Sequence, residues 1–276
     1  MVVSGEQKKP PLPRGRGSDG KGGEPPVGPR ADARGSDRKA ARTGKAEMTP
    51  DIQALLSLFP LWYVAFLLSL TCHEAAHALV AKWGGDLTAY HSGQVTLNPL
   101  PHIQREPFGT VLVPILSLFL SGWMLGWGSA PYDPHWEQRH PKRSALMALA
   151  GPTANVLLAL VAVFLIHAGT AMGFFQIPET FGFIRVVEAT SESGEGAAQF
   201  LSILFSLNLL LATFNLLPVP PLDGHSAVGL VLPEDLFRRW LELVRSPMLS
   251  LLGLIIAWQY FHVVFFPVFY LALRLL

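Results

Sequence analysis

Five stretches of this chain approach the length and apolarity of a membrane-spanning helix. They lie at about 52–82, 108–127, 145–168, 199–217 and 248–273. A helix needs roughly 20 mostly apolar residues to cross the hydrocarbon of a bilayer, and a soluble domain rarely needs so many apolar runs. We therefore expect an all-α polytopic membrane protein with about four to five transmembrane helices, embedded in the lipid bilayer.

The charged residues gather outside these stretches. The first fifty residues hold eleven of the 21 Lys and Arg residues, with many Pro and Gly and few large apolar side chains. Such a composition cannot bury enough apolar surface to fold. We predict that 1–48 form a disordered, basic, Pro/Gly-rich tail without a catalytic role, and that 49–276 form the membrane domain. Cys72 is the only cysteine, so neither an internal disulfide nor a cysteine-based zinc site can form.

The first apolar stretch contains polar residues late in its length, in the sequence His73-Glu74-Ala75-Ala76-His77. Residues four apart on a helix project from one face, so both imidazoles can reach one metal ion. Glu74 lies about 100° further around the helix axis. From there it can act as a general base on water beside the metal, but it is poorly placed to be a ligand.

This motif has an alternative interpretation, which is a helix with two incidental histidines and one acidic residue near the interface. A carboxylate at the centre of a bilayer costs about 2.5–3.5 kcal/mol on insertion scales, and such residues are usually functional. The small side chains of Ala75, Ala76 and Ala78 would also let another helix or an extended substrate approach closely. Both points favour the metal site.

A catalytic zinc site normally uses three protein ligands, and the best candidate for the third is Asp223. It follows Pro220 and Pro221, which end a helix and hold the chain extended. Gly224 allows a sharp turn, so the carboxylate can point back toward another helix. The alternative is an ordinary loop aspartate, since Pro and Asp are common in loops.

Three motifs in this order resemble the site-2 protease family of intramembrane zinc metalloproteases. They are His73 to His77, the element Gly151-Pro152-Thr153-Ala154-Asn155, and the segment from Asn215 to Gly224. The stretch from Leu97 to Ile103, followed by Phe108-Gly109-Thr110, resembles a compact bacterial and archaeal branch without an appended PDZ or CBS domain. The resemblance extends over about 55–232.

The resemblance implies that His73, His77 and Asp223 bind one catalytic Zn²⁺ and that Glu74 is the catalytic base. It further implies a zinc-dependent endopeptidase that cleaves transmembrane protein substrates, as in regulated intramembrane proteolysis, and a location in the bacterial cytoplasmic membrane. No nucleic-acid partner is expected. The alternatives are a catalytically inactive scaffold that binds membrane proteins and a metal transporter.

Asn155 and Asn215 each have two interpretations. Either amide could bind a substrate strand or support a zinc ligand, or it could satisfy a helix end. The chain also departs from the branch where Gln104-Arg105-Glu106 follows His102-Ile103, and where Gly128-Ser129-Ala130 stands in place of a lysine before proline. Neither departure touches a proposed ligand.

The segment between the first two apolar stretches carries a signal for strands. Partial alternation around Val95 predicts a short β-hairpin within Leu87–Asn98 that flanks the active site.

Five simple crossings of the membrane would place 17 of the 21 Lys and Arg on one side, as the positive-inside rule favours. They would also put His73 and Asp223 toward opposite faces. Because one zinc ion must join these two residues, we expect 108–127 to re-enter, with the tail on the outer side.

Overall fold

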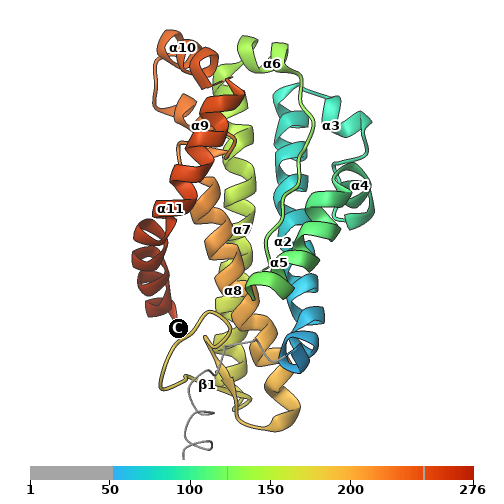
Figure 1. Ribbon diagram of the computed structural model, residues 1–276, viewed down its shortest axis with the longest axis vertical. Helices are drawn as coiled ribbons and strands as arrows, with labels where there is room; N and C mark the ends of the chain where they lie inside the picture. The colour runs from blue at the N-terminus through green and yellow to red at the C-terminus, as the bar shows by residue number, and fades with distance from the viewer. Residues whose placement is uncertain (1–51, 123, 245) are drawn as a thin grey trace, which may run out of the picture. The chain divides into compact units, whose positions relative to one another are not determined.

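Four long helices contain most of the apolar sequence in the computed structural model, which describes residues 52–122, 124–244 and 246–276 (Figure 1). They are α2 (Ile52–Gly84), α7 (Pro141–Ala171), α8 (Glu195–Asn215) and α11 (Pro247–Ala272). Each is long and apolar enough to cross a membrane. The prediction of an all-α polytopic membrane protein is confirmed. The predicted disordered tail, 1–48, lies outside the described residues.

Shorter elements connect these helices. In chain order they are α3 (Thr88–His91), α4 (Pro99–Arg105), the π-helix η1 (Phe108–Leu112), α5 (Val113–Ser121), α6 (Pro134–Arg139), β1 (Phe175–Gln176), β2 (Glu188–Ala189), the 3₁₀-helix η2 (Glu192–Gly194), α9 (Gly224–Ala227), the 3₁₀-helix η3 (Val228–Leu230), α10 (Glu234–Val244) and the 3₁₀-helix η4 (Leu273–Leu275).

The core lies where α2, α7 and α8 pack against one another. Phe66 of α2, Ala162 of α7 and Phe205 of α8 are all buried in it. Helix α8 is the most enclosed of the four long helices and α11 the least. The exposed apolar face of α11 suits contact with lipid tails, whereas α2, α7 and α8 pack against one another. Those three helices carry most of the candidate site.

The second apolar stretch turns back on itself instead of crossing the bundle. Residues 108–120 run at 112° to α4. Helix α5 ends at Gly122, whose φ of 73° is the left-handed conformation common at helix ends. Residues 124–133, called the return segment here, then lead back to α6, next to the end of α2 (Figure 1).

Backbone hydrogen bonds hold the return segment along η1 and α5. The Trp127 amide donates to the Gly109 carbonyl at 3.1 Å, an acceptor within the π-helix. Further along, the Asp133 amide donates to Asp86 Oδ2 at 2.8 Å, just beyond the end of α2. The segment therefore starts beside Phe66, in the middle of α2, passes Glu74, and ends beside Asp86, just beyond the end of that helix.

The hairpin predicted within Leu87–Asn98 was wrong. This segment forms the short helix α3 followed by turns, and Asn98 caps α4 by accepting a hydrogen bond from the Leu100 amide at 3.0 Å. Asn followed by Pro at the first helical position is a helix-start signal that outweighs weak alternation. The strands of the described residues are instead β1 and β2, which pair Phe175 with Ala189 beyond the far end of α7.

Candidate metal centre and active site

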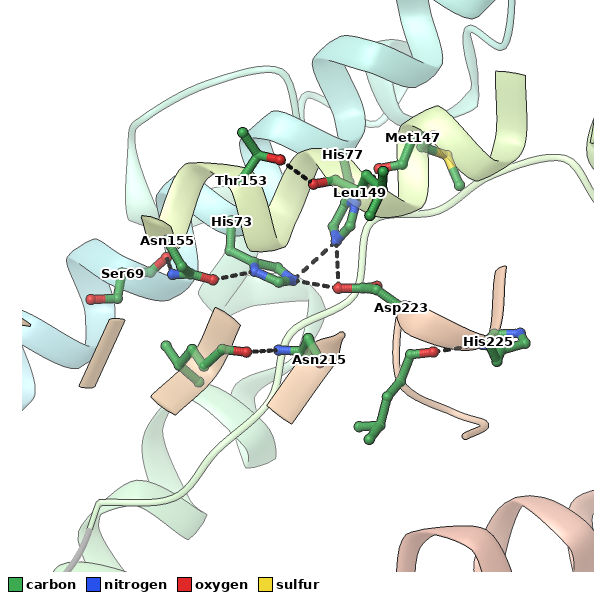
Figure 2. Close-up of polar contacts among 12 residues, drawn as sticks. Ser69, His73, His77, Met147, Leu149, Thr153, Asn155, Asn215, Asp223 and His225 are labelled. Atoms are coloured by element: carbon green, nitrogen blue, oxygen red, sulfur yellow. Dashed lines mark hydrogen bonds and ion pairs between the residues drawn. The ribbon is translucent and has the colours of Figure 1, made fainter. Parts of the chain in front are cut away.

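Helix α2 presents His73 and His77 on one face, as their spacing of four residues predicts. Both side chains point toward Asp223 in Figure 2. The Nε2 atoms of the two rings lie 3.0 Å apart, and the rings meet edge-on. Both residues are buried, with 6% and 5% of their surface exposed. The two histidines thus supply two of the three side chains that could hold a metal ion.

Asp223 reaches the histidines from the loop after α8. The proline-containing turn and Gly224 bring the chain back over the end of that helix. A Cβ at Gly224 would overlap the carbonyl oxygens of Leu216 and Leu217, so the close approach itself requires glycine. Asp223 Oδ2 consequently lies 3.1 Å from His73 Nε2 and 3.3 Å from His77 Nε2.

The three atoms fit a single zinc ion. Ligand atoms about 2.0–2.1 Å from a tetrahedral zinc would lie about 3.3–3.4 Å from one another, and here they are 3.0–3.3 Å apart. Asp223 Oδ2 is also buried without a hydrogen-bond partner among the described residues, which suits an atom that binds a cation. Three nitrogen and oxygen ligands leave a fourth position open, as in catalytic zinc sites.

The electrostatic surroundings favour the metal-binding form of Asp223. Burial raises the pKa of its carboxyl group, but the imidazoles of His77 and His73 beside it, when they carry a positive charge, outweigh burial and hold the pKa below its usual range. The group is therefore ionised at neutral pH. Ionised carboxylates are the form that binds zinc.

Each histidine has a hydrogen-bond partner at the ring nitrogen that faces away from the centre. His73 Nδ1 lies 2.6 Å from Asn155 Oδ1, and His77 Nδ1 lies 2.7 Å from the Met147 carbonyl oxygen. Both acceptors belong to α7. This arrangement leaves the two Nε2 atoms to face Asp223, where a metal ion would bind, and such partners orient metal-binding histidines.

Glu74 is buried beside this centre, with 5% of its surface exposed. The return segment passes against it, because a Cβ at Gly128 would lie 2.9 Å from both Cγ and Oε1 of Glu74. Position 128 is one of the departures from the family pattern noted above. Its lack of a side chain leaves room for the Glu74 carboxylate.

The structure distinguishes the two asparagines that the sequence left ambiguous. Asn155 contacts His73, whereas Asn215 donates a hydrogen bond to the Leu211 carbonyl of its own helix at 3.1 Å. Sequence reasoning missed Asn208 and Ser69, which are buried behind Asn155. A lone amide within an apolar stretch was the available signal for Asn208. For Ser69 the available signal was its position four residues before His73, which places both residues on one face of α2.

Long apolar helices around a His-Glu-x-x-His helix, with an aspartate beside its two histidines, are the arrangement typical of membrane-embedded metallopeptidases. The chain belongs to peptidase family M50, whose family model matches residues 61–258. The resemblance to site-2 proteases is thereby confirmed, and the chain is an integral multi-pass membrane protein.

Relatives of this chain carry the name "Putative zinc metalloprotease", and two of them illustrate the similarity. YwhC of Bacillus subtilis is 35% identical over 179 residues, which cover 64% of this chain and 72% of YwhC. Rip2 of Mycolicibacterium smegmatis is 30% identical over 173 residues, which cover 63% of this chain and 58% of Rip2. No solved structure gives a significant match.

Proposed function

We propose that this protein is a zinc-dependent endopeptidase that hydrolyses peptide bonds of membrane-embedded protein substrates. One Zn²⁺ would be held by His73, His77 and Asp223, with Glu74 as general base. The observation that carries the proposal is the meeting of three buried ligand atoms within 3.0–3.3 Å of one another, beside a buried carboxylate. Membership of a peptidase family and the names of the relatives agree with it.

The proposed chemistry divides between the metal and Glu74. Zinc in such a site polarises the scissile carbonyl and makes water a better nucleophile at neutral pH. Glu74 would take the proton that water loses on attacking the carbonyl carbon. It would then give this proton to the amine that leaves, so the glutamate ends the cycle ionised, as it began.

The substrate would have to be extended where it is cut. The carbonyl groups of a helix are hydrogen-bonded and sterically covered, so a helical segment must unwind first. The β-hairpin near Val95 that was expected to flank the active site is replaced by α3 and turns, so it offers no strand for such a substrate to pair with. The return segment now fills this role in the proposal, because it passes directly against Glu74. An extended peptide beside residues 126–130 would lie within reach of the centre.

Two other classes of function remain as alternatives. A scaffold that only binds membrane proteins would not require a carboxylate at position 74, so the burial of Glu74 beside the ligands argues against it. A metal transporter would need further polar ligands along a path through the bundle. Both alternatives predict binding without cleavage, and one experiment separates them from a protease.

The test compares wild type with Glu74→Gln, purified with zinc and reconstituted with a single-span substrate that contains helix-breaking residues. Glu74→Gln should keep its zinc and lose cleavage by about 10²–10⁴-fold, the usual contribution of a general base. Glu242→Gln, an exposed glutamate of α10, is the matched control and should cleave normally. Equal cleavage by wild type and Glu74→Gln would reject the proposal, as would full activity after a chelator removes all zinc.

A further inference from the structure

A chain of buried amide and hydroxyl groups extends from the metal centre into the helix bundle. Asn155 of α7 contacts His73, Asn208 of α8 contacts Asn155, and Ser69 of α2 contacts Asn208 (Figure 2 shows the first and last members). Ser69, Asn155 and Asn208 have no exposed surface. In an apolar bundle such a chain is costly unless its groups are paired. Its continuity toward one zinc ligand therefore calls for a functional explanation.

The direction of each hydrogen bond in this chain can be deduced from its far end. Asn208 Nδ2 lies 2.8 Å from the Leu204 carbonyl oxygen, which can only accept. The same nitrogen lies 2.8 Å from Ser69 Oγ, and the Ser69 hydroxyl hydrogen is used by the Ala65 carbonyl oxygen at 2.6 Å. Two backbone carbonyls thus require the NH₂ group of Asn208 to face α2 and its own helix.

The orientation of Asn208 then determines that of Asn155. Asn208 Oδ1 is left to face α7, where it accepts from Asn155 Nδ2 at 2.8 Å. That nitrogen also lies 3.4 Å from the Ser69 carbonyl oxygen. A flipped Asn155 amide would place an oxygen against these two acceptors. Asn155 Oδ1 must therefore face His73.

The orientation of Asn155 finally determines which nitrogen of His73 carries the proton. An amide oxygen only accepts, so at 2.6 Å it requires a hydrogen on His73 Nδ1. The neutral ring then has its lone pair on Nε2, which faces Asp223 and His77. His77 has the equivalent support from the Met147 backbone carbonyl.

We propose that Asn155 is a positioning residue for His73, and that Asn208 and Ser69 fix its amide so that the zinc-binding tautomer of His73 exists before metal arrives. The inference rests on the ligand set proposed above. It assigns to Asn155 a role in zinc affinity and not in substrate binding. Losing such a partner of a metal-binding histidine typically weakens metal binding about 10–100-fold.

The test measures zinc dissociation constants of the purified full chain in detergent by competition with a chelating dye. Asn155→Leu has a similar size but no acceptor, and it should bind zinc about 10–100-fold more weakly than wild type. Asn155→Asp should restore affinity to within about threefold of wild type, because one carboxyl oxygen still accepts from His73 Nδ1 and the other, protonated in this buried position, can donate to Asn208 Oδ1 as the amide does. Thr153→Val, on the same helix, is the control and should bind as wild type, since the Thr153 hydroxyl bonds only the Leu149 carbonyl.

Rescue by aspartate distinguishes positioning from packing. A role limited to packing would leave zinc affinity unchanged in Asn155→Leu, or would affect Asn155→Leu and Asn155→Asp equally, and either result overturns the proposal. If Asn155→Leu does not fold, Asn208→Leu replaces it. That substitution leaves the His73 contact in place but removes the acceptor that orients Asn155, so affinity should fall about 3–10-fold. Unchanged affinity in Asn208→Leu would overturn the orienting role.

The same measurements distinguish an error in the proposed zinc ligands from an error in the role given to Asn155. If wild type does not bind one zinc per chain, or if His73→Ala binds it as tightly as wild type, the proposed function fails. If wild type binds zinc through His73 while Asn155→Leu is unaffected, the proposed function stands and only this inference fails.

Discussion

Gly151 of α7 faces the metal-binding edge of His73 with no room for a side chain between them. A Cβ at position 151 would lie 2.5 Å from His73 Nε2, and closer still to His77 Nε2. The glycine of the Gly151-Pro152-Thr153-Ala154-Asn155 element is therefore explained by sterics. It lets α7 approach the two histidines closely enough for Asn155 and the Met147 carbonyl to hold their rings.

Substituting Gly151 should remove zinc. We expect Gly151→Ala to place a methyl group between the two Nε2 atoms and to lower zinc affinity at least about 10-fold, as loss of correct ligand placement does. Metal content after dialysis against a weak chelator would measure this. Gly196→Ala in α8 is the matched control, because a Cβ there meets nothing within 4 Å. Stoichiometric zinc in Gly151→Ala would contradict the steric explanation.

A substitution at Gly128 should affect catalysis and leave zinc in place. The added Cβ would lie 2.9 Å from Glu74 Oε1, and its three nearest atoms all belong to Glu74. Displacing the general base from its position should lower kcat, by an amount up to the 10²–10⁴-fold that such a base contributes, so about 10-fold is a reasonable expectation for Gly128→Ala. The measurement is kcat and bound zinc on the same preparation. Lost zinc with unchanged kcat per bound ion would argue against this assignment.

Asp86 should stabilise the return segment. Its buried carboxylate accepts hydrogen bonds from the Thr88 amide at 2.9 Å, the Thr88 hydroxyl at 2.6 Å and the Asp133 amide at 2.8 Å. Asp86→Ala leaves these donors without their acceptor and should reduce the free energy of unfolding by about 1–3 kcal/mol. Thermal unfolding in detergent would detect this as a lower Tm. Asp235→Ala, in the first turn of α10, serves as comparison and should change Tm far less.

The orientation of the protein can be tested with single cysteines in a Cys72→Ser background. Helices α6 and α10 lie at one end of the bundle (Figure 1). The basic residues of α6, of the first turn of α7, of α10 and of the last turn of α2 are Arg139, Lys142, Arg143, Arg238, Arg239 and Lys82. The positive-inside rule predicts that this end is cytoplasmic. In intact cells a membrane-impermeant maleimide should label Glu179→Cys, between β1 and β2, and should not label Glu242→Cys on α10. The reverse pattern would refute this orientation and the predicted outer side of the tail.

Much of this architecture could be predicted from sequence because the dominant signals are local. Apolar stretches predicted α2, α7, α8 and α11 to within a few residues, and the spacing of His73 and His77 predicted one ligand-bearing face. The re-entrant arrangement followed from a requirement of the site, since His73 and Asp223 must lie at the same depth. Each of these predictions needed only the length of an apolar stretch, the period of a helix, or one geometric condition on the site.

The rest depended on contacts between distant parts of the chain. Nothing near Asn208 in sequence indicates that its amide orients Asn155, which is 53 residues away. The closeness of Gly128 to Glu74 likewise requires knowing that the return segment passes along α2. The hairpin error had another cause, because weak alternation was preferred over the helix-start signal at Asn98 and Pro99.

The reversal at Gly122 also has a consequence for how the protein is made. As residues 108–127 emerge from the ribosome they have the apolarity of a crossing segment, and insertion machinery reads apolarity. The finished molecule needs that stretch to return to the side from which it came. We expect that in some nascent chains residues 108–127 first cross the membrane. They would return once α7 has been inserted and the hydrogen bond from the Asp133 amide to Asp86 has formed. The count of membrane crossings would then be decided by folding after insertion, and Asp86→Ala should increase the share of chains trapped in the wrong count.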